Sequence, residues 1–322
     1  MQISIIITTY KRRKDLKECL KSILFQTRLP REILIVDNGN DEETEKLVKE
    51  NLGEFERKNV LLKYLRNERE NSLTMARNIG VKNAIGDIIL FLDDDVVLDK
   101  DYLKELLKVY EKYPNTVGVQ GYITQEKISK IRNLVSKALS LYHLEKDRCR
   151  VLSSVTTTYP YQLNKISSCE WLSGANHSYK RQILEEFMYD EKLKKYSEGE
   201  DLEFSYRVFK KYPGSLYITP YAKLIHKTSS EGRPLGKELI NMREIYGLYL
   251  FYKVIDQNFK NKLIYLWSRI GKLIFNIGRS FFKLSSAGLI ENIFTIGAYI
   301  YCIKHLKEIK KGKLNFFNQT LK

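Results

Sequence analysis

The sequence predicts an α/β fold in which a mostly parallel sheet is covered by helices on both faces. Short apolar runs alternate with longer amphipathic stretches along the first hundred residues, which is typical of repeated β–α–β units. Polar residues follow directly after several of these runs, as they do where parallel strands end at a ligand-binding edge. The chain has 322 residues, 43% of them hydrophobic, so a sizeable core with a smaller companion domain is expected.

The individual elements follow from the same alternation. The expected strands are 3–8, 33–36, 60–65 and 88–92. The expected helices are a stretch ending near residue 26, then 42–50, 74–84 and one that follows Asp99. An amphipathic stretch at 128–144 comes next, where the alternation becomes irregular. Continuous apolar runs such as residues 3–8 are typical of strands buried on both faces.

Charge and cysteine content limit the class of protein. The formal net charge is +16, which favours an anionic partner such as nucleic acid, lipid headgroups or a phosphorylated substrate. Cys19, Cys149, Cys169 and Cys302 are scattered and form no CxxC pair, so neither a zinc ribbon nor a disulfide framework is predicted. The first residues place charge after the apolar run, the reverse of a secretory signal, and a reduced compartment is expected.

Two common nucleotide-binding motifs are missing. The turn after the first expected strand reads TTYKRRK, without the glycines of GxGxxG. The segment from Gly232 to Glu238 approaches a P-loop but is one residue short and lacks the hydroxyl. A nucleotide would therefore bind without a glycine-rich phosphate cradle.

Three adjacent carboxylates end the strand FLDDDV. Asp93 and Asp95 fall on the same side of a strand, and oxygen ligands of this kind suit Mg²⁺ or Mn²⁺ bridging to substrate phosphates. A solvated acidic turn before a helix is the simpler interpretation. From the triplet alone, the metal site and the solvated acidic turn are about equally well supported.

Five segments in order resemble the family 2 glycosyltransferases with the GT-A fold, over about residues 1–230. They are SIIITTYKR, ILIVDNG, ARNIGVKNAIGDIILFLDDDV, WLSGAN and GEDLEFSYRV. The resemblance implies a nucleotide-diphospho-sugar transferase domain at 1–230, followed by a helical extension at 231–322. It also implies inverting transfer of a sugar from a nucleoside-diphosphate donor to a hydroxyl of a glycan or lipid-linked acceptor.

The resemblance also implies residue roles. The nucleotide and donor would be bound by Thr8, Thr9, Tyr10, Asp37, Arg77, Asp93, Asp94, Gly174 and Ala175. Asp95 and His226 would ligate Mn²⁺ or Mg²⁺. Asp201 would be the general base, with Glu200 beside it. Taken alone, each of these residues also has a structural interpretation. The residue could end a strand, cap a helix or form a turn, and Arg77 could form a surface ion pair with Glu70.

The family's processive members carry QxxRW after the base motif, and this chain has none. Addition of a single sugar, as in rhamnosyltransferase-like or related enzymes, is therefore favoured. Uridine, deoxythymidine and guanosine diphosphate sugars all occur with these motifs, so the donor stays open.

The tail is strongly basic, with fifteen Lys and Arg against five acids from Lys237 onward. At helical spacing, Lys262, Arg269, Lys272, Arg279 and Lys283 fall within an arc of about 100°, with Trp, Ile and Phe on another side. This pattern predicts a helix lying in a membrane interface. The uncharged run 293–303 is too short to cross a bilayer. Packing of the tail on the catalytic domain is the alternative, and nucleic-acid binding is disfavoured by the many large aliphatics.

Together these observations predict a metal-dependent enzyme attached peripherally to the cytoplasmic face of the cell membrane. The alternative is a non-enzymatic basic protein that binds membrane or nucleic acid and whose carboxylates are structural.

Overall fold

The structure is a computed structural model that describes residues 1–124, 129–283 and 285–321. The chain divides into two compact units. The first comprises Met1–Glu126, Gln162–Lys195 and Glu200–Arg233, and the second comprises Lys127–Tyr161, Tyr196–Gly199 and Pro234–Lys322. The second unit thus combines the basic tail with a middle segment that the sequence pattern did not group with it.

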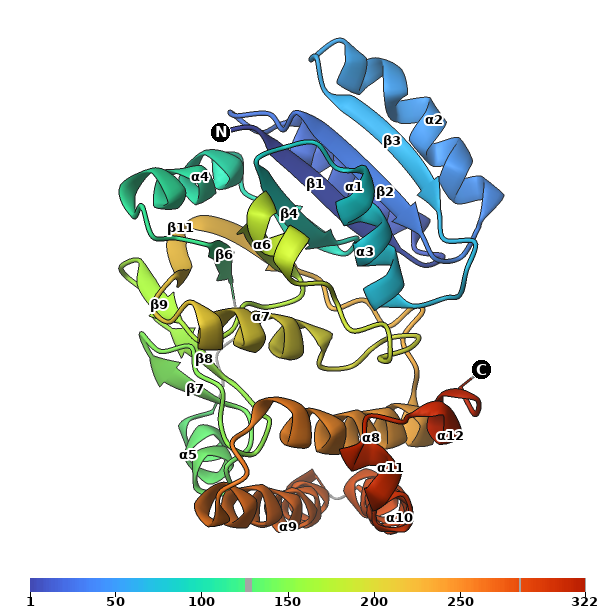
Figure 1. The fold of residues 1–322 in the computed structure, drawn as a ribbon, viewed down its shortest axis with the longest axis vertical. Helices are drawn as coiled ribbons and strands as arrows, with labels where there is room; N and C mark the ends of the chain where they lie inside the picture. The colour runs from blue at the N-terminus through green and yellow to red at the C-terminus, as the bar shows by residue number, and fades with distance from the viewer. Residues whose placement is uncertain (125–128, 284, 322) are drawn as a thin grey trace. The chain divides into compact units, whose positions relative to one another are not determined.

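The first unit is built on one mixed sheet (Figure 1). Its strands are β1 Ile3–Thr9, β2 Glu32–Asp37, β3 Leu61–Arg66, β4 Ile88–Asp93, β5 Val96–Leu98, β6 Gly118–Ile123, β9 Ser167–Cys169, β10 Asn176–Lys180 and β11 Leu216–His226. The order is β3-β2-β1-β4-β10-β6-β11-β5, with β9 paired to β11. Strands β3, β2, β1 and β4 are mutually parallel, which confirms the predicted β–α–β start.

Strand β10 departs from the predicted alternation because it runs antiparallel between β4 and β6. Its residues NHSYK contain no apolar run, although four of the five are buried. Neighbouring strands supply its hydrogen bonds, so it forms without a strong pattern of its own.

Helices cover both faces of this sheet. They are α1 Arg13–Leu24, α2 Glu42–Glu56, α3 Leu73–Asn83, α4 Tyr102–Lys112, α6 Arg181–Glu186 and α7 Glu200–Lys211. On one face, Ile3, Ile5 and Ile7 of β1 share a core with α1, α2 and α4. On the other face, α3 approaches so closely that a Cβ on Gly80 would lie 2.5 Å from Ile6. Alternate side chains of a buried strand thus meet helices on opposite faces.

The second unit is largely helical. Its elements are α5 Lys130–Ala138, the parallel strand pair β7 His143–Lys146 and β8 Thr158–Tyr161, and then α8 Gly236–Val254, α9 Phe259–Lys283, α10 Ala287–Lys304, α11 Leu306–Lys310 and α12 Asn315–Asn318. Helix α5 is shorter than the expected stretch 128–144, of which residue 128 lies outside the described residues. Among the described helices, none combines the length and apolar character needed to cross a membrane.

Candidate active site

The carboxyl ends of β1, β2 and β4 meet at one edge of the sheet. Thr9 is in register with Asp37 of β2, and Thr8 is in register with Asp93 of β4. The polar residues that follow three separate apolar runs are therefore neighbours in space, as expected for parallel strands. Tyr10 follows at the end of β1 and is partly buried.

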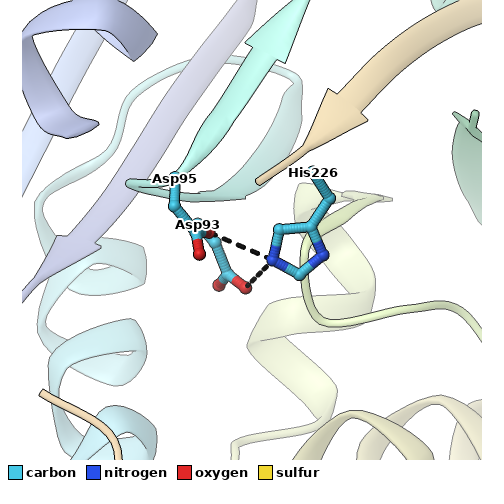
Figure 2. A group of neighbouring side chains, drawn as sticks. All are labelled: Asp93, Asp95 and His226. Carbon is cyan, nitrogen blue, oxygen red and sulfur yellow. Dashed lines mark ion pairs between the residues drawn. The ribbon is translucent and has the colours of Figure 1, made fainter. Parts of the chain in front are cut away.

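Asp93, Asp95 and His226 form a cluster at this edge (Figure 2). Nε2 of His226 lies 3.1 Å from Oδ1 of Asp95 and 3.9 Å from Oδ2 of Asp93. His226 ends β11, which pairs antiparallel with β5 directly after the acidic turn. That pairing brings a histidine 131 positions beyond Asp95 to the carboxylates, since His226 is in register with Val96.

The cluster fits a divalent cation. Within the described part of the chain, Oδ1 of Asp95 and Nε2 of His226 are buried and have no hydrogen-bond partner. The two atoms form a 3.1 Å ion pair without a geometric hydrogen bond, and a cation bound between them would supply the partner that each lacks. One imidazole nitrogen and two carboxylates are ligands that Mn²⁺ accepts, and the carboxylates alone suit Mg²⁺. The family resemblance implies Asp95 and His226 as ligands, and the geometry adds Asp93 as a third candidate.

Burial and neighbouring charges act differently on the three side chains. Burial raises the pKa of Asp93, and Asp95 raises it further, although Arg77 and His226 lower it. Burial opposes the charge on Asp95, but His226, the Ser229 N–H and Arg12 outweigh it and lower the pKa of Asp95 to about 2. Burial likewise lowers the pKa of His226, whereas Asp95 and Asp93 raise it above its ordinary value overall. A bound cation would compensate the two neighbouring carboxylates and take the place of the imidazole proton.

Asp94, the middle carboxylate, makes its contacts with other side chains of the protein. Its Oδ2 accepts a 2.7 Å hydrogen bond from the Thr9 hydroxyl, and its Oδ1 lies 3.0 Å from Nη1 of Arg12. The side chain is buried. Burial raises its pKa to about 7, against the lowering effect of Arg12 and Thr9. Asp94 thus ties β4 to the loop after β1, and any part in donor binding would act through Thr9 and Arg12.

The segment after β11 contributes residues that the sequence reasoning missed. Oδ2 of Asp95 accepts a 2.8 Å hydrogen bond from the Ser229 N–H and lies 3.4 Å from Nη2 of Arg233. Nε of Arg12 donates to the carbonyl of Glu231. The basic residues in the segments KRR and GRP are the only sequence signal for these contacts. Their acidic partners lie more than eighty residues away along the chain, so local patterns could not pair them.

Arg77 is the centre of a second, buried group. Its Nη1 lies 2.6 Å from Oε1 of Glu200, its Nη2 donates to the Gly174 carbonyl at 3.1 Å, and Nη2 is also 3.6 Å from Oδ1 of Asp93. The expected alternative, a surface pair with Glu70, is wrong, because Glu70 pairs with Lys194. Arg77 therefore links three segments of the site.

The acids at the start of α7 complete this group. Oδ2 of Asp201 accepts a 2.8 Å hydrogen bond from the Gly174 N–H, and Oδ1 accepts one from the Leu202 N–H. Burial, together with the charge of Asp201, raises the pKa of Glu200 to about 8 in spite of Arg77. A Cβ on Gly174 would lie 3.1 Å from Glu200 Oε1 and 3.3 Å from Asp201 Oδ2. Ala175 follows and accepts the backbone hydrogen bond of Asp93.

Asp37 is fully buried at the end of β2. Its carboxylate accepts hydrogen bonds from the N–H groups of Gly39 and Asp41 and from the Tyr64 hydroxyl, at 2.7 to 2.8 Å. These bonds shape the loop after β2. An Asp37 contact with a nucleotide base would have to be made beside them.

Comparison with known proteins places these residues in context. Residues 4–187 match the sequence profile described as Glycosyl transferase family 2. A stretch of 132 residues is 29% identical to the glucosyl-dolichyl phosphate glucuronosyltransferase of Haloferax volcanii, covering 40% of this chain and 41% of that protein. Another of 190 residues is 26% identical to glycosyltransferase GlyA of Streptococcus pneumoniae, covering 59% and 26%. The matches span less than half of either relative.

Solved structures share the fold. The mannosyltransferase PcManGT of Pyrobaculum calidifontis, in complex with GDP-Man and Mn²⁺, aligns over 93% of this chain and 86% of its own, with a TM-score of 0.58 and 14% identity. TarS 1–349 of S. aureus aligns over 98% and 88%, with a TM-score of 0.55 and 16% identity. At such identities the likeness shows the fold, which is the GT-A fold.

Proposed function

Because the chain belongs to glycosyl transferase family 2, we propose that it moves one sugar from a nucleoside-diphosphate sugar to a hydroxyl of a glycan or lipid-linked acceptor, with inversion. One observation carries this proposal. The cation-binding cluster of Asp93, Asp95 and His226 and the acidic pair Glu200–Asp201 meet through a single side chain, because Arg77 contacts both Asp93 and Glu200. A donor diphosphate and an acceptor hydroxyl would need these two groups side by side.

Asp95, His226 and Asp93 would hold Mn²⁺ or Mg²⁺. Such an ion, when bound, offsets the negative charge that grows on the diphosphate as it leaves. The chain's own contribution is to hold these three ligands in place. Ser229 and Arg233 do so for Asp95, and β5–β11 pairing does so for His226.

Asp201 is the proposed general base. Direct inverting transfer needs one carboxylate that takes the proton of the attacking hydroxyl. Glu200 is engaged by Arg77 at 2.6 Å, which favours a positioning role for Glu200 and leaves Asp201 as the base. The Gly174 N–H, which donates to Asp201, orients its carboxylate.

The donor would lie along the edge formed by Thr8, Thr9, Tyr10 and Asp37, with Gly174 and Ala175 beside the sugar. Arg77 would act there through Gly174 and Asp93, because its guanidinium is buried among protein groups. The absence of QxxRW supports addition of a single sugar. The basic, amphipathic tail supports a peripheral position at the cytoplasmic face of the membrane.

The test is a titration of UDP-, dTDP- and GDP-sugars in the presence and absence of Mn²⁺. We expect one nucleotide class to bind at millimolar concentration or better, and more tightly with Mn²⁺. Absence of binding by every donor would favour the alternative of a non-enzymatic basic protein with structural carboxylates.

A further inference from the structure

Helices α9 and α10 of the second unit present an unusual surface. Every exposed side chain of α9 between Leu263 and Phe282 is apolar. They are Leu263, Leu266, Trp267, Ile270, Ile274, Ile277, Phe281 and Phe282. The exposed large apolar side chains of α10 are Leu289, Ile290, Ile293, Ile296, Ile300 and Ile303, and its last residue, Lys304, is also exposed. We call these two sets together the apolar face. It exceeds the scattered single apolar residues that are normal on a protein surface.

The buried side of the same helices carries several polar side chains beside Tyr265, Ala298 and Cys302. Ser268, Asn276 and Ser280 of α9 and Asn292 and Thr295 of α10 are buried. A helix on the surface of a water-soluble protein has the opposite arrangement, with its apolar stripe inward. The exposed side of these helices is therefore suited to an apolar environment.

Contacts between α9 and α10 are of the kind used by helices in lipid. Nδ2 of Asn276 donates to Oδ1 of Asn292 at 2.9 Å, and Nδ2 of Asn292 donates to the Leu273 carbonyl at 3.0 Å. Gly288 lies so close to α9 that a Cβ there would be 2.2 Å from the Asn276 carbonyl oxygen. Small residues and inter-helix hydrogen bonds hold helices together where burial of apolar surface cannot.

The basic stripe expected from the sequence does not lie on the surface as a whole. Nη1 of Arg269 and Nζ of Lys272 turn inward to Glu244 of α8, at 2.7 and 3.0 Å. Arg279 pairs with Glu291 of α10 at 2.7 Å. Lys262 is exposed, and the side chain of Lys283 is outside what the structure describes. Most of the expected electrostatic contribution is thus used within the protein.

Exposed cations are present beside the apolar face instead of opposite it. Lys260 and Lys262 lie at the start of α9. Helix α5, which carries the exposed Lys130, Arg132 and Lys137, adjoins α9, because Nε1 of Trp267 donates to the carbonyl of Ala138, the last residue of α5, at 2.9 Å. A second copy of the chain placed on this face would bring like charges together, whereas anionic headgroups would complement them.

We propose that the apolar face of α9 and α10 inserts among the acyl chains of an anionic bilayer, with the cations of α5 and the start of α9 at the headgroups. This inference rests on the membrane attachment proposed above, and it changes the interaction that is expected to supply most of the binding. Apolar insertion, which salt does not screen, is the main source of binding, and surface charge is the smaller one.

The test is flotation of the full chain with vesicles of phosphatidylcholine containing phosphatidylglycerol. The variant pair Ile274→Asn and Ile277→Asn alters exposed residues of the apolar face, so folding in water is retained. We expect each substitution to weaken vesicle binding about tenfold, since burial of an isoleucine is lost. Ile85→Asn is the matched control, because Ile85 is an equally exposed isoleucine, 47% accessible, in the first unit. It should bind as the unaltered chain does.

Charge is tested separately. Lys260→Gln with Lys262→Gln should weaken binding severalfold, and 0.5 M NaCl should weaken binding of the unaltered chain less than tenfold. Full release by salt, or unchanged binding by the isoleucine variants, would overturn the proposal. A lipid-free dimer that Ile274→Asn dissociates, without vesicle binding, would identify the face as a contact between copies and also overturn it.

Nucleotide-sugar binding, measured without vesicles, distinguishes this proposal from the enzymatic one. We expect the isoleucine variants to bind donor as the unaltered chain does. Vesicle binding without any donor binding would support the membrane-inserting face and contradict the proposed function.

Discussion

The guanidinium of Arg77 lies 2.6 Å from the carboxylate of Glu200, although 123 positions separate the two residues. Both side chains are buried. The pair joins α3 to the start of α7 and, through the Gly174 carbonyl, to the loop before β10. Removing Glu200 would leave the Arg77 guanidinium as a buried charge, whereas removing Arg77 would raise the pKa of Glu200 further above its ordinary value, so that its carboxyl takes up a proton.

The first prediction follows from that pair. Glu200→Gln should lower the free energy of unfolding by about 3 kcal/mol, because it leaves the buried Arg77 guanidinium, which cannot lose its charge, without its partner. Arg77→Gln combined with Glu200→Gln should cost less than the sum of the two single changes. Urea unfolding of the four proteins measures this coupling, and strictly additive losses would contradict it.

Gly174 provides a second prediction. Gly174→Ala places a Cβ 3.1 to 3.3 Å from Glu200 Oε1, Arg77 Nη2 and Asp201 Oδ2, which is tighter than ordinary contact. We expect sugar transfer to fall by about ten- to a hundredfold, because small displacements of catalytic groups are costly. Gly53→Ala in α2, where a Cβ meets nothing within 4 Å, is the control. It should leave transfer unchanged and stabilise the helix by up to about 1 kcal/mol.

Asp201 and Asp95 should separate chemistry from binding. Asp201→Asn removes the proposed base and should lower transfer by at least about a hundredfold with donor affinity nearly intact. Asp95→Asn should weaken Mn²⁺ and donor together, since it removes a proposed ligand. Calorimetric titration of both variants with donor and Mn²⁺ tests this. Equal loss of donor affinity in the two variants would remove the separate roles.

The buried Glu244 predicts a pH effect on stability. Burial alone would raise its pKa, but Arg269 and Lys272 lower it below the ordinary 4.5. A lowered folded-state pKa gives stability that is present above about pH 4.5 and is lost as pH falls through the folded value. Glu244→Gln should therefore cost about 3 kcal/mol at pH 7.

The difference in the free energy of unfolding between Glu244→Gln and the unaltered chain should then shrink as pH falls from about 5 to 3. Chemical unfolding across that range measures the difference. A difference in unfolding free energy that does not change with pH would show that the charged Glu244 carboxylate is not the source of this stabilisation.

Local patterns in the chain are sufficient to predict the parallel half of the sheet and the edge where the site lies. Apolar runs such as Ile33–Val36 favour buried strands, and polar residues at their ends are brought to one edge by parallel pairing. The family motifs imply a metal site of Asp95 and His226, and these two residues lie together with Asp93 in the structure. Each of these inferences depends on short-range periodicity or on a motif of adjacent residues.

Tertiary contacts decided the rest. The antiparallel insertion of β10, the use of Asp94 by Thr9 and Arg12, and the pairing of Arg77 with Glu200 each join segments that are remote in sequence. Helical periodicity placed Arg269 and Lys272 on one side of α9 but could not tell whether that side faces water. Glu244 of α8 turns both cations inward, because a buried carboxylate needs compensating charge, and this leaves the aliphatic side of α9 exposed.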